Sequence, residues 1–384
     1  MVEPRFRWLF PDPVTLSPEL TVAASRHDLA PRVAGLLAAR GVTDAAGLDA
    51  WFGEPLAGLH DPRALPDAEP ALARIRRARD GRERVMVFGD FDADGLTGLS
   101  ILVLAFRRLG LTVDPYVPSR LEEGHGLSLA AVTAAAEAGV SLITTVDCGT
   151  SSVEEVAAAR ARGIDVIVTD HHRVPTELPA AVAIVNPHRP ESGYPDVQLS
   201  GSGVAFKLAC LVLESEPGGR AAALDLADLA TIGSIADVAP VVGENRAIAR
   251  LGLARLRRDP RPGLAALLGR AGVPPEAADL ETIAFAIAPR LNAAGRMGEA
   301  IEAARLLLAE DADTAATLAD TLEAANQARR DLTSTATGEA RAAVQVDAPE
   351  DLDATLVLGE WPVGIIGLVA SRLAEELGRP AVVA

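Results

Sequence analysis

Three acid-rich turns stand out because each directly follows a short apolar run. They are Gly89-Asp90-Phe91-Asp92-Ala93-Asp94-Gly95 after 85–88, Asp147-Cys148-Gly149 after 141–146, and Asp170-His171-His172 after 165–169. One Asp in such a turn is equally well explained as a helix N-cap, but several converging carboxylates repel one another and need a cation to hold them. Oxygen donors with an imidazole suit Mn²⁺ or Mg²⁺, and two such ions that share a carboxylate form the usual clamp for phosphoester hydrolysis. The residue types therefore predict a divalent-metal site.

Two other ligand loops fit the first turn poorly. Its alternating Asp residues resemble the start of a calcium-binding loop, but a strand precedes them and Ile101 stands where the twelfth-position Glu is needed. The turn from Gly95 to Gly98 is too short for a phosphate-binding loop, because no Gly-Lys-Ser/Thr comes after it. We interpret its glycines as allowing a tight turn into a helix.

The elements that must position these turns alternate between strand and helix. The predicted strands are 85–88, 112–117, 141–146, 165–169 and 181–185, separated by helical segments. This alternation is typical of βαβ units around a parallel sheet. Ligands of open α/β sheets bind at the carboxyl ends of the strands, where all three acid-rich turns lie. The sequence predicts an α/β fold with the site at that edge.

Beyond about residue 200 the strands stop and helices take over. Helices are expected at 203–214, 221–235, 245–257, 276–287 and 299–309, followed by a long Ala-rich helix at 311–342. A strand at 352–359, a helix at 365–377 and a strand from 380 then predict the start of another α/β domain. We predict four parts: a helical lead-in (1–68), a catalytic domain (69–310), a connector helix (311–345) and an incomplete domain (346–384). A chain that stops on an apolar strand predicts a fragment of a longer protein.

Composition limits the class of protein. The 384 residues carry 36 Lys and Arg against 53 Asp and Glu, and the net charge of −17 argues against a generally basic nucleic-acid binder. Lys207 is the only lysine, and we expect the arginines of the 69–79 helix to form a solvated face. Stretches of about 18 uncharged residues are lacking, which argues against a membrane span. Cys148 and Cys210 cannot build a disulfide framework, which favours a reducing cytoplasm.

In their order and spacing, the three turns resemble the DHH phosphoesterase superfamily, and within it the RecJ family of single-strand-specific exonucleases. The segments 199–207 and 289–297 support this resemblance, and 361–373 is similar to the start of the DHH-associated domain. The resemblance implies a parallel-sheet DHH catalytic domain over 69–310 with a helical extension beyond about 200. It also implies that the associated domain begins near 346 and is incomplete.

The resemblance also implies roles for individual residues. The implied metal ligands are Asp92, Asp94, Asp147, His171 and Asp237, with Asp147 bridging two ions, Asp90 as a ligand or a neighbouring acid, and His172 facing the scissile phosphate. The implied substrate contacts are Arg120, Arg290, Asn292, Arg296, Ser371 and Arg372. From the residues alone, Asp237 ends an apolar helix, where the helix dipole disfavours an acid, so it is either a metal ligand or a cap before Pro240. Phe88 and Pro362 stand where relatives carry histidines.

The function that these patterns indicate is that of a metal-dependent hydrolase. The resemblance implies an exonuclease that degrades single-stranded DNA from the 5′ end with two Mn²⁺ or Mg²⁺ ions, in DNA repair and recombination. Single-stranded DNA, a single-strand-binding protein and a helicase are the implied partners, with no membrane. Two alternatives stay open: a DHH phosphodiesterase for short oligonucleotides or cyclic dinucleotides, and a non-catalytic DHH scaffold of a replication assembly.

Overall fold

The structure is a computed structural model that describes residues 14–120, 122–297, 300–347 and 353–384. The first residues of the expected lead-in and the start of the expected strand at 352 lie outside these ranges. The chain forms two compact units, divided between Leu59 and His60. The first unit holds the helices α1 (Pro18–Arg26), α2 (Pro31–Ala38) and α3 (Ala45–Phe52) and the 3-10 turn η1 (Pro55–Gly58). Leu20 and Leu48 lie in its small core.

The boundary of the second unit lies earlier than the predicted residue 68. The amide of His60 donates to Glu244, and Asp67 accepts the amide of Ile184, 117 residues further along the chain. These long-range bonds attach 60–68, including the 3-10 turn η2 (Pro62–Ala64), to the second unit.

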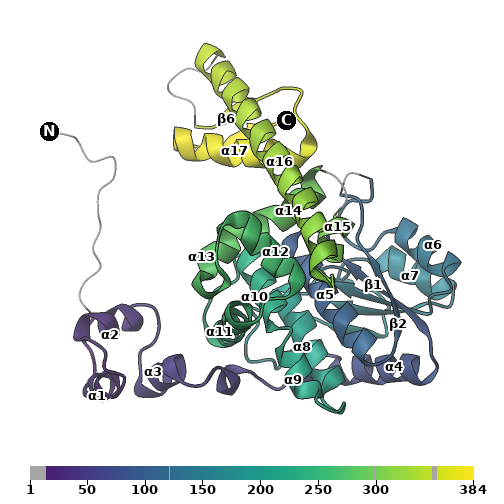
Figure 1. Ribbon diagram of the computed structural model, residues 1–384, viewed down its shortest axis with the longest axis horizontal. Helices are drawn as coiled ribbons and strands as arrows, with labels where there is room; N and C mark the ends of the chain where they lie inside the picture. The colour runs from purple at the N-terminus through teal and green to yellow at the C-terminus, as the bar shows by residue number, and fades with distance from the viewer. Residues whose placement is uncertain (1–13, 121, 298–299, 348–352) are drawn as a thin grey trace. The chain divides into compact units, whose positions relative to one another are not determined.

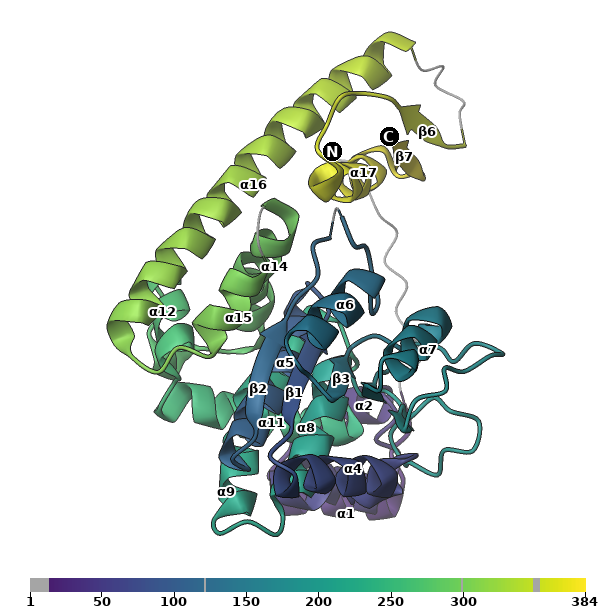
Figure 2. The ribbon, with the colours of Figure 1, turned by 90° about the vertical axis from the view of Figure 1, so that its right-hand side faces the viewer.

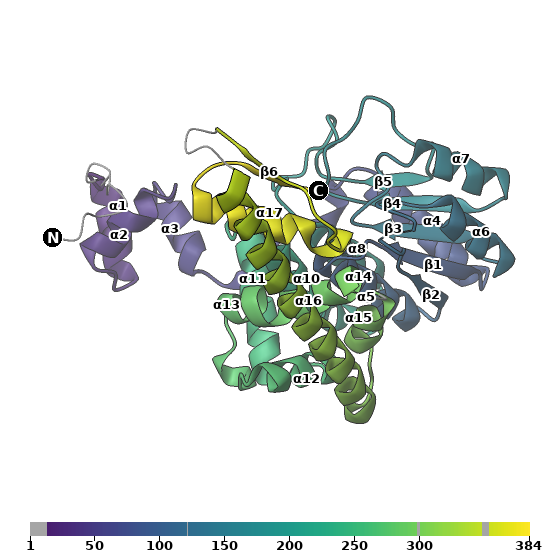
Figure 3. The ribbon, with the colours of Figure 1, turned by 90° about the horizontal axis from the view of Figure 1, so that it is seen from above.

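A parallel five-stranded sheet forms the centre of the second unit and confirms the predicted α/β class (Figure 3). The strand order is β2-β1-β3-β4-β5. The strands are β1 (Arg84–Gly89), β2 (Thr112–Tyr116), β3 (Leu142–Val146), β4 (Asp165–Thr169) and β5 (Ala183–Val185). Gly89 lies opposite Val146, which lies opposite Thr169, so β1, β3 and β4 end in register. The acid-rich turns therefore leave the sheet side by side.

Helices cover both faces of this sheet (Figure 3). The helices α6 (Leu129–Glu137) and α7 (Val153–Ala161) enclose an apolar cluster with Phe88 and Ile143 on one face. The helices α5 (Ala93–Arg108) and α8 (Gly201–Leu213) pack together on the other face, and α4 (Ala68–Asp80) contacts α8 and β5. Because the central strands are buried on both sides, they read as continuous apolar runs.

The arginines of α4 form the expected solvated face only in part, because Arg76 and Arg77 are exposed but Arg74 is buried. The Arg74 side chain is only 3% exposed and binds both Glu83, at 2.6 Å, and Asp165, at 2.5 Å. Arg77 also binds Asp165, and Arg79 binds Glu216. The expectation was wrong for Arg74 because Asp165 lies 91 residues further along the chain and becomes its neighbour only in the fold.

The helical extension is more divided than predicted. Its helices are α9 (Gly219–Leu224), α10 (Ala227–Ala236), α11 (Gly243–Arg258), α12 (Pro262–Ala271), α13 (Leu280–Thr282), α14 (Ala288–Met297) and α15 (Ile301–Leu307), with a 3-10 turn η3 (Pro275–Ala277). The single helix expected at 221–235 is two helices, and α12 was not predicted. A π-helical turn, η4 (Ile283–Ile287), joins α13 to α14 just before Pro289. Because proline cannot donate a backbone hydrogen bond, this is a natural place for an irregular turn.

The predicted connector is the long helix α16 (Ala312–Asp347). It packs on α12, α14 and α15, and further along it carries α17 (Val363–Leu377) through a small core that includes Ala336 and Ala340 (Figure 2). Two parallel strands, β6 (Thr355–Val357) and β7 (Ala381–Val383), lie beside α17. Within the described ranges, every helix is too short or too polar to cross a membrane.

Candidate metal centre

The structure brings all seven predicted acid and imidazole side chains into one cluster. Three overlapping groups have ligand atoms within 4.8 Å of one another: Asp90, Asp92 and Asp147; Asp94, His171 and Asp237; and Asp147, His171 and His172. Asp147 and His171 each belong to two groups. A shared carboxylate between two groups of donors is the arrangement that a pair of cations requires.

The first turn is held by the start of two helices. Asp92 caps α5, since its Oδ1 accepts the amides of Asp94 and Gly95, both at 3.0 Å. Asp94 accepts the amides of Gly201, at 2.7 Å, and Ser202, at 3.0 Å, at the start of α8. Helix α5 therefore begins at Ala93, directly after the capping Asp92. Both carboxylates lie where helix dipoles favour negative charge.

The second turn places Asp147 in an unusual backbone conformation. Its φ is 61°, in the left-handed region that Asp tolerates better than most residues. Gly149 has a φ of 106°, and a Cβ there would lie 2.6 Å from Thr145 Oγ1. A Cβ at Gly201 would lie 2.5 Å from the Asp147 Cβ. The turn is therefore tightly enclosed, and Cys148 is a buried packing residue within it.

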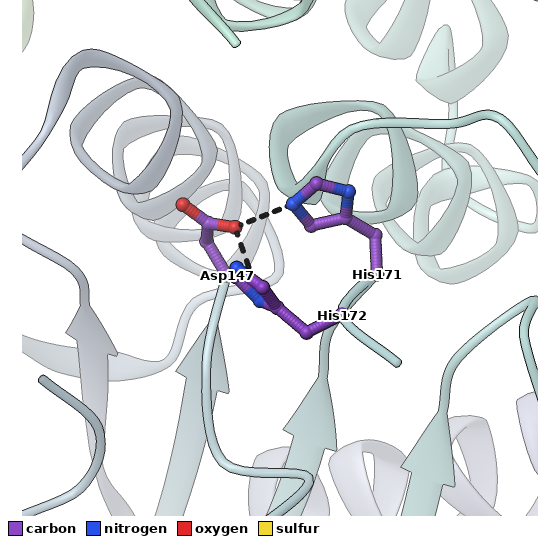
Figure 4. A group of neighbouring side chains, drawn as sticks. All are labelled: Asp147, His171 and His172. Carbon is purple, nitrogen blue, oxygen red and sulfur yellow. Dashed lines mark ion pairs between the residues drawn. The ribbon is translucent and has the colours of Figure 1, made fainter. Parts of the chain in front are cut away.

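The third turn directs His171 and His172 toward Asp147 (Figure 4). The buried Asp170 holds this turn in place. Asp170 accepts the amides of His171 and Thr150 and bonds the His172 ring nitrogen Nδ1 at 2.7 Å. Although burial raises the pKa of Asp170, the bonds from His172 and Thr150 lower it to about 2. The bond to Asp170 raises the pKa of His172 to about 8. Sequence reasoning assigned no role to Asp170, whose bond from the amide of Thr150, 20 residues away, becomes visible only in the fold.

Asp237 joins the cluster from the end of α10. It is the C-cap of that helix, and its Oδ2 lies 3.9 Å from His171 Nδ1. Burial and the charge of Asp94 raise the pKa of Asp237. An acid at a helix C-terminus next to a second carboxylate is unfavourable without a cation. This position favours the interpretation of Asp237 as a ligand over a simple cap.

The electrostatics of the cluster test whether a cation fits. Burial raises the pKa of Asp147 well above its usual range and that of Asp92 to about 6. The nearby charge of Asp94 is the second cause of both shifts. Among the described residues, the buried atoms Asp90 Oδ1, Asp147 Oδ1 and His171 Nε2 have no hydrogen-bond partner, although the last two lie only 3.0 Å apart. Buried polar atoms are normally satisfied. Here two carboxylate oxygens and one imidazole nitrogen lack hydrogen-bond partners within the same cluster. This set of donor atoms fits Mn²⁺ or Mg²⁺.

The loop that carries Arg120 and His125 lies against this centre. His125 Nδ1 is 3.3 Å from Asp90 Oδ2, and its ring is 4.5 Å from the Phe91 ring. The Arg120 guanidinium lies 5.1 Å from the Phe91 ring centre. Glu123 fixes the loop by accepting bonds from Tyr116 and the Ser119 amide. The only sequence signal for His125 is its place in Glu123-Gly-His-Gly, between two strands of the sheet.

The expected substrate contacts have different surroundings. Asn292 Oδ1 accepts the amide of Ala93, at 2.7 Å, so it holds the turn that carries Asp92 and Asp94. Arg296 donates to the Gly364 carbonyl of α17, at 2.9 Å. Arg290 is buried and bound to Glu323 of α16, at 2.5 Å, which differs from the expected phosphate contact. Ser371 and Arg372 lie on the exposed side of α17.

The two departures from relatives occupy packing positions. Phe88 is fully buried beneath α6 and α7 and stacks on Tyr116, with ring centres 5.6 Å apart. Its ring therefore fills the apolar cluster in place of a ligand. Pro362 is the N-cap residue of α17, where its missing amide hydrogen costs nothing.

Comparisons with known proteins agree with this geometry. The model of the DHH family, N-terminal domain, matches residues 84–234. The single-stranded-DNA-specific exonuclease RecJ of Bacillus subtilis is 40% identical over 92% of this chain, and that of Thermus thermophilus is 41% identical over 85%. A crystal structure of exonuclease RecJ bound to manganese has a TM-score of 0.74 and 37% identity, over 83% of this chain and 80% of that one. A manganese complex of RecJ from Thermus thermophilus has a TM-score of 0.81 and 34% identity, over 97% of this chain and 53% of that one.

The chain therefore belongs to the DHH family, and within it to the RecJ family. It spans 44% of the length of the Bacillus subtilis relative and 46% of the Thermus thermophilus relative. The shared part contains the parallel sheet and the entire candidate metal centre.

Proposed function

We propose that this chain is the catalytic part of a RecJ-type exonuclease, which removes nucleotides from the 5′ end of single-stranded DNA in DNA repair and recombination. The observation that carries the proposal is the cluster of seven acid and imidazole side chains that includes Asp147, with buried atoms that lack a hydrogen-bond partner at its centre. A non-catalytic scaffold has no need for such a set. Burying these carboxylates without a cation costs stability.

Mn²⁺ or Mg²⁺ ions, when bound, supply an activated water and stabilise the negative charge that develops on the phosphate. Asp92, Asp94, Asp147, His171 and Asp237 are the residues that would hold two such ions, with Asp90 beside them. His172 is 61% exposed and bound to Asp170, so its ring is oriented and free to donate toward a phosphate oxygen. The arginines Arg120 and Arg296 lie near enough to each other for their charges to interact, and we assign both to the substrate phosphates.

We propose that a single-strand-binding protein and a helicase supply the single strand, and that the protein works in the cytoplasm. The two cysteines are unpaired, which is consistent with a reducing compartment.

A hydrolysis assay tests the proposal. The chain is incubated with Mn²⁺ and a 3′-labelled single strand, the matching duplex, or a dinucleotide. We expect stepwise shortening of the single strand from its 5′ end, loss of activity with a chelator, and slower reaction of the duplex. A faster reaction with the dinucleotide than with the long strand would favour the small-substrate alternative. Absence of metal-dependent hydrolysis would favour the scaffold.

A further inference from the structure

A cavity beside the metal centre is lined by none of the seven clustered donors. Its volume is about 400 Å³, and residues of α10, η4, α14, α16 and α17 line it. Val238, directly after the candidate ligand Asp237, is one of its lining residues. Helix α14 packs against both α16 and α17 here (Figure 1). The cavity therefore lies between the metal centre and the C-terminal helices of the same compact unit.

The apolar part of the cavity exposes side chains that a protein normally buries. Phe285, in the π-helical turn, is 79% exposed, and Val238 is 85% exposed. Val238 also has a φ of 60°, which a β-branched residue rarely adopts. Such outliers persist where the surrounding structure enforces them, and they gather at ligand-binding sites. An exposed aromatic face beside a cavity is suited to stacking against a flat ring.

The polar part of the cavity carries two positive charges. Arg296 and Arg329 both line it, and among the described residues neither forms an ion pair with a carboxylate. The buried Nε of Arg329 has no hydrogen-bond partner there, while another of its nitrogens binds Asn326 at 3.0 Å. Burial lowers the pKa of both guanidinium groups. Two such groups with spare donors fit a phosphodiester anion.

We infer that this cavity binds one nucleotide of the single strand, with its base against Phe285 and Val238 and its phosphate on Arg296 and Arg329. The inference rests on the proposed function and assigns a place to a nucleotide beside the scissile phosphate. The charge favours a nucleotide over an apolar peptide, since two unpaired arginines would remain unsatisfied beside a peptide without acids. Because the contact is to the flat face of a base, which every base has, we expect binding that does not depend on base identity.

An abasic scan tests the inference. Single strands of twelve nucleotides carry one abasic residue at each successive position from the 5′ end, and KM and kcat are measured with Mn²⁺. For the unmodified chain, we expect an abasic residue at the first or second position to raise KM at least about fivefold, with little effect further along. Phe285→Ala should raise KM for the intact strand by a similar factor. It should cause no further rise in KM for the strand that has the abasic residue at the first or second position. Phe285→Trp should restore the original KM.

Matched variants separate this contact from general damage. Arg329→Ala should raise KM for both strands, whereas its neighbour Arg330→Ala and the exposed Leu332→Ala on the same helix should not. Mn²⁺ binding should be unchanged in Phe285→Ala, because Phe285 is outside the metal cluster. The inference is overturned if no abasic position matters, or if Phe285→Ala raises KM equally for intact and abasic strands. A chain that cleaves no single strand at all would instead refute the proposed function.

Discussion

The two ends of the central sheet both bury charged side chains, but they treat them differently. At the amino ends of the strands, Arg74 lies between Glu83 and Asp165 and also donates to the Ser141 carbonyl. At the carboxyl ends, the acids Asp90 and Asp147 have buried oxygen atoms without partners in the described chain. Although Arg74 Nη1 is also buried without a hydrogen-bond partner, two carboxylates balance the charge of Arg74 within the protein. The charges of the clustered acids are left to be balanced from outside. The difference separates charges that stabilise the fold from those that bind a ligand.

The strongest test of this contrast is Asp147→Ala. Removing the shared carboxylate should abolish binding of two ions and lower the rate of hydrolysis by at least about 100-fold. The metal-free variant should be as stable as the parent or more so, because a buried, repelled charge is lost. Mn²⁺ stoichiometry, single-strand hydrolysis and thermal unfolding are measured together. Binding of two ions with more than a few per cent of parental activity would contradict the role given to Asp147.

At the opposite end of the sheet, Arg74→Met should lower stability and leave activity unchanged. The variant keeps an apolar stem but leaves Glu83 and Asp165 without their shared partner, so we expect a loss of about 2 kcal/mol in the free energy of unfolding. This is less than for a fully buried pair, because both acids are partly exposed. Urea unfolding measures the loss, with Arg76→Met as the control on the same helix. Nuclease activity per folded molecule should not change; a selective loss of activity would place Arg74 in the functional site.

Arg290→Gln tests the same distinction, between charges that stabilise the fold and charges that bind a ligand, among the expected substrate contacts. Because Arg290 is bound to Glu323 and to the Ala286 carbonyl, the variant should lower the free energy of unfolding by about 1 kcal/mol and leave KM for single strands unchanged. The matched variant Arg296→Gln should raise KM. If Arg290→Gln raises KM as much as Arg296→Gln does, Arg290 contacts the strand after all.

The smallest expected effect is a pH dependence of the metal-free protein. Asp92 has its pKa raised to about 6 and His172 to about 8, so the folded state binds more protons than the unfolded state across this range. Stability should therefore fall as pH rises from about 5 to 8, by about 1 kcal/mol. Thermal unfolding with a chelator at several pH values measures this slope. Saturating Mn²⁺ should reverse its sign, since the ligands bind metal only when deprotonated; an unchanged slope would contradict a metal site here.

Local sequence was enough to predict that the three acid-rich turns meet at one edge of the sheet, but it did not predict what surrounds them. Parallel strands end at one edge, so acids that come after successive strands must meet there, whatever the details of the fold. The bonds of Arg74 to Asp165 and of Arg290 to Glu323 join residues 91 and 33 positions apart, and nothing near either arginine marks its partner. Asp92 and Asp94 were interpreted only as ligands, although Asp92 also accepts amides at the start of α5 and Asp94 accepts amides at the start of α8. His125 was missed because its closeness to Asp90 depends on how the loop folds back.

The π-helical turn at Ile283–Ile287 has a consequence for the phase of the helix after it. Each residue of an α-helix advances by about 100° around the axis, so a wide turn shifts every later side chain relative to those before it. The side chains of α13 and α14 therefore point in different relative directions than they would if the whole segment were one regular α-helix. Deleting one residue from the turn would let the helix become regular, yet would rotate Asn292 away from the amide of Ala93 or displace Phe285. The length of this one turn therefore sets the angular alignment between the proposed nucleotide cavity and the metal-binding edge.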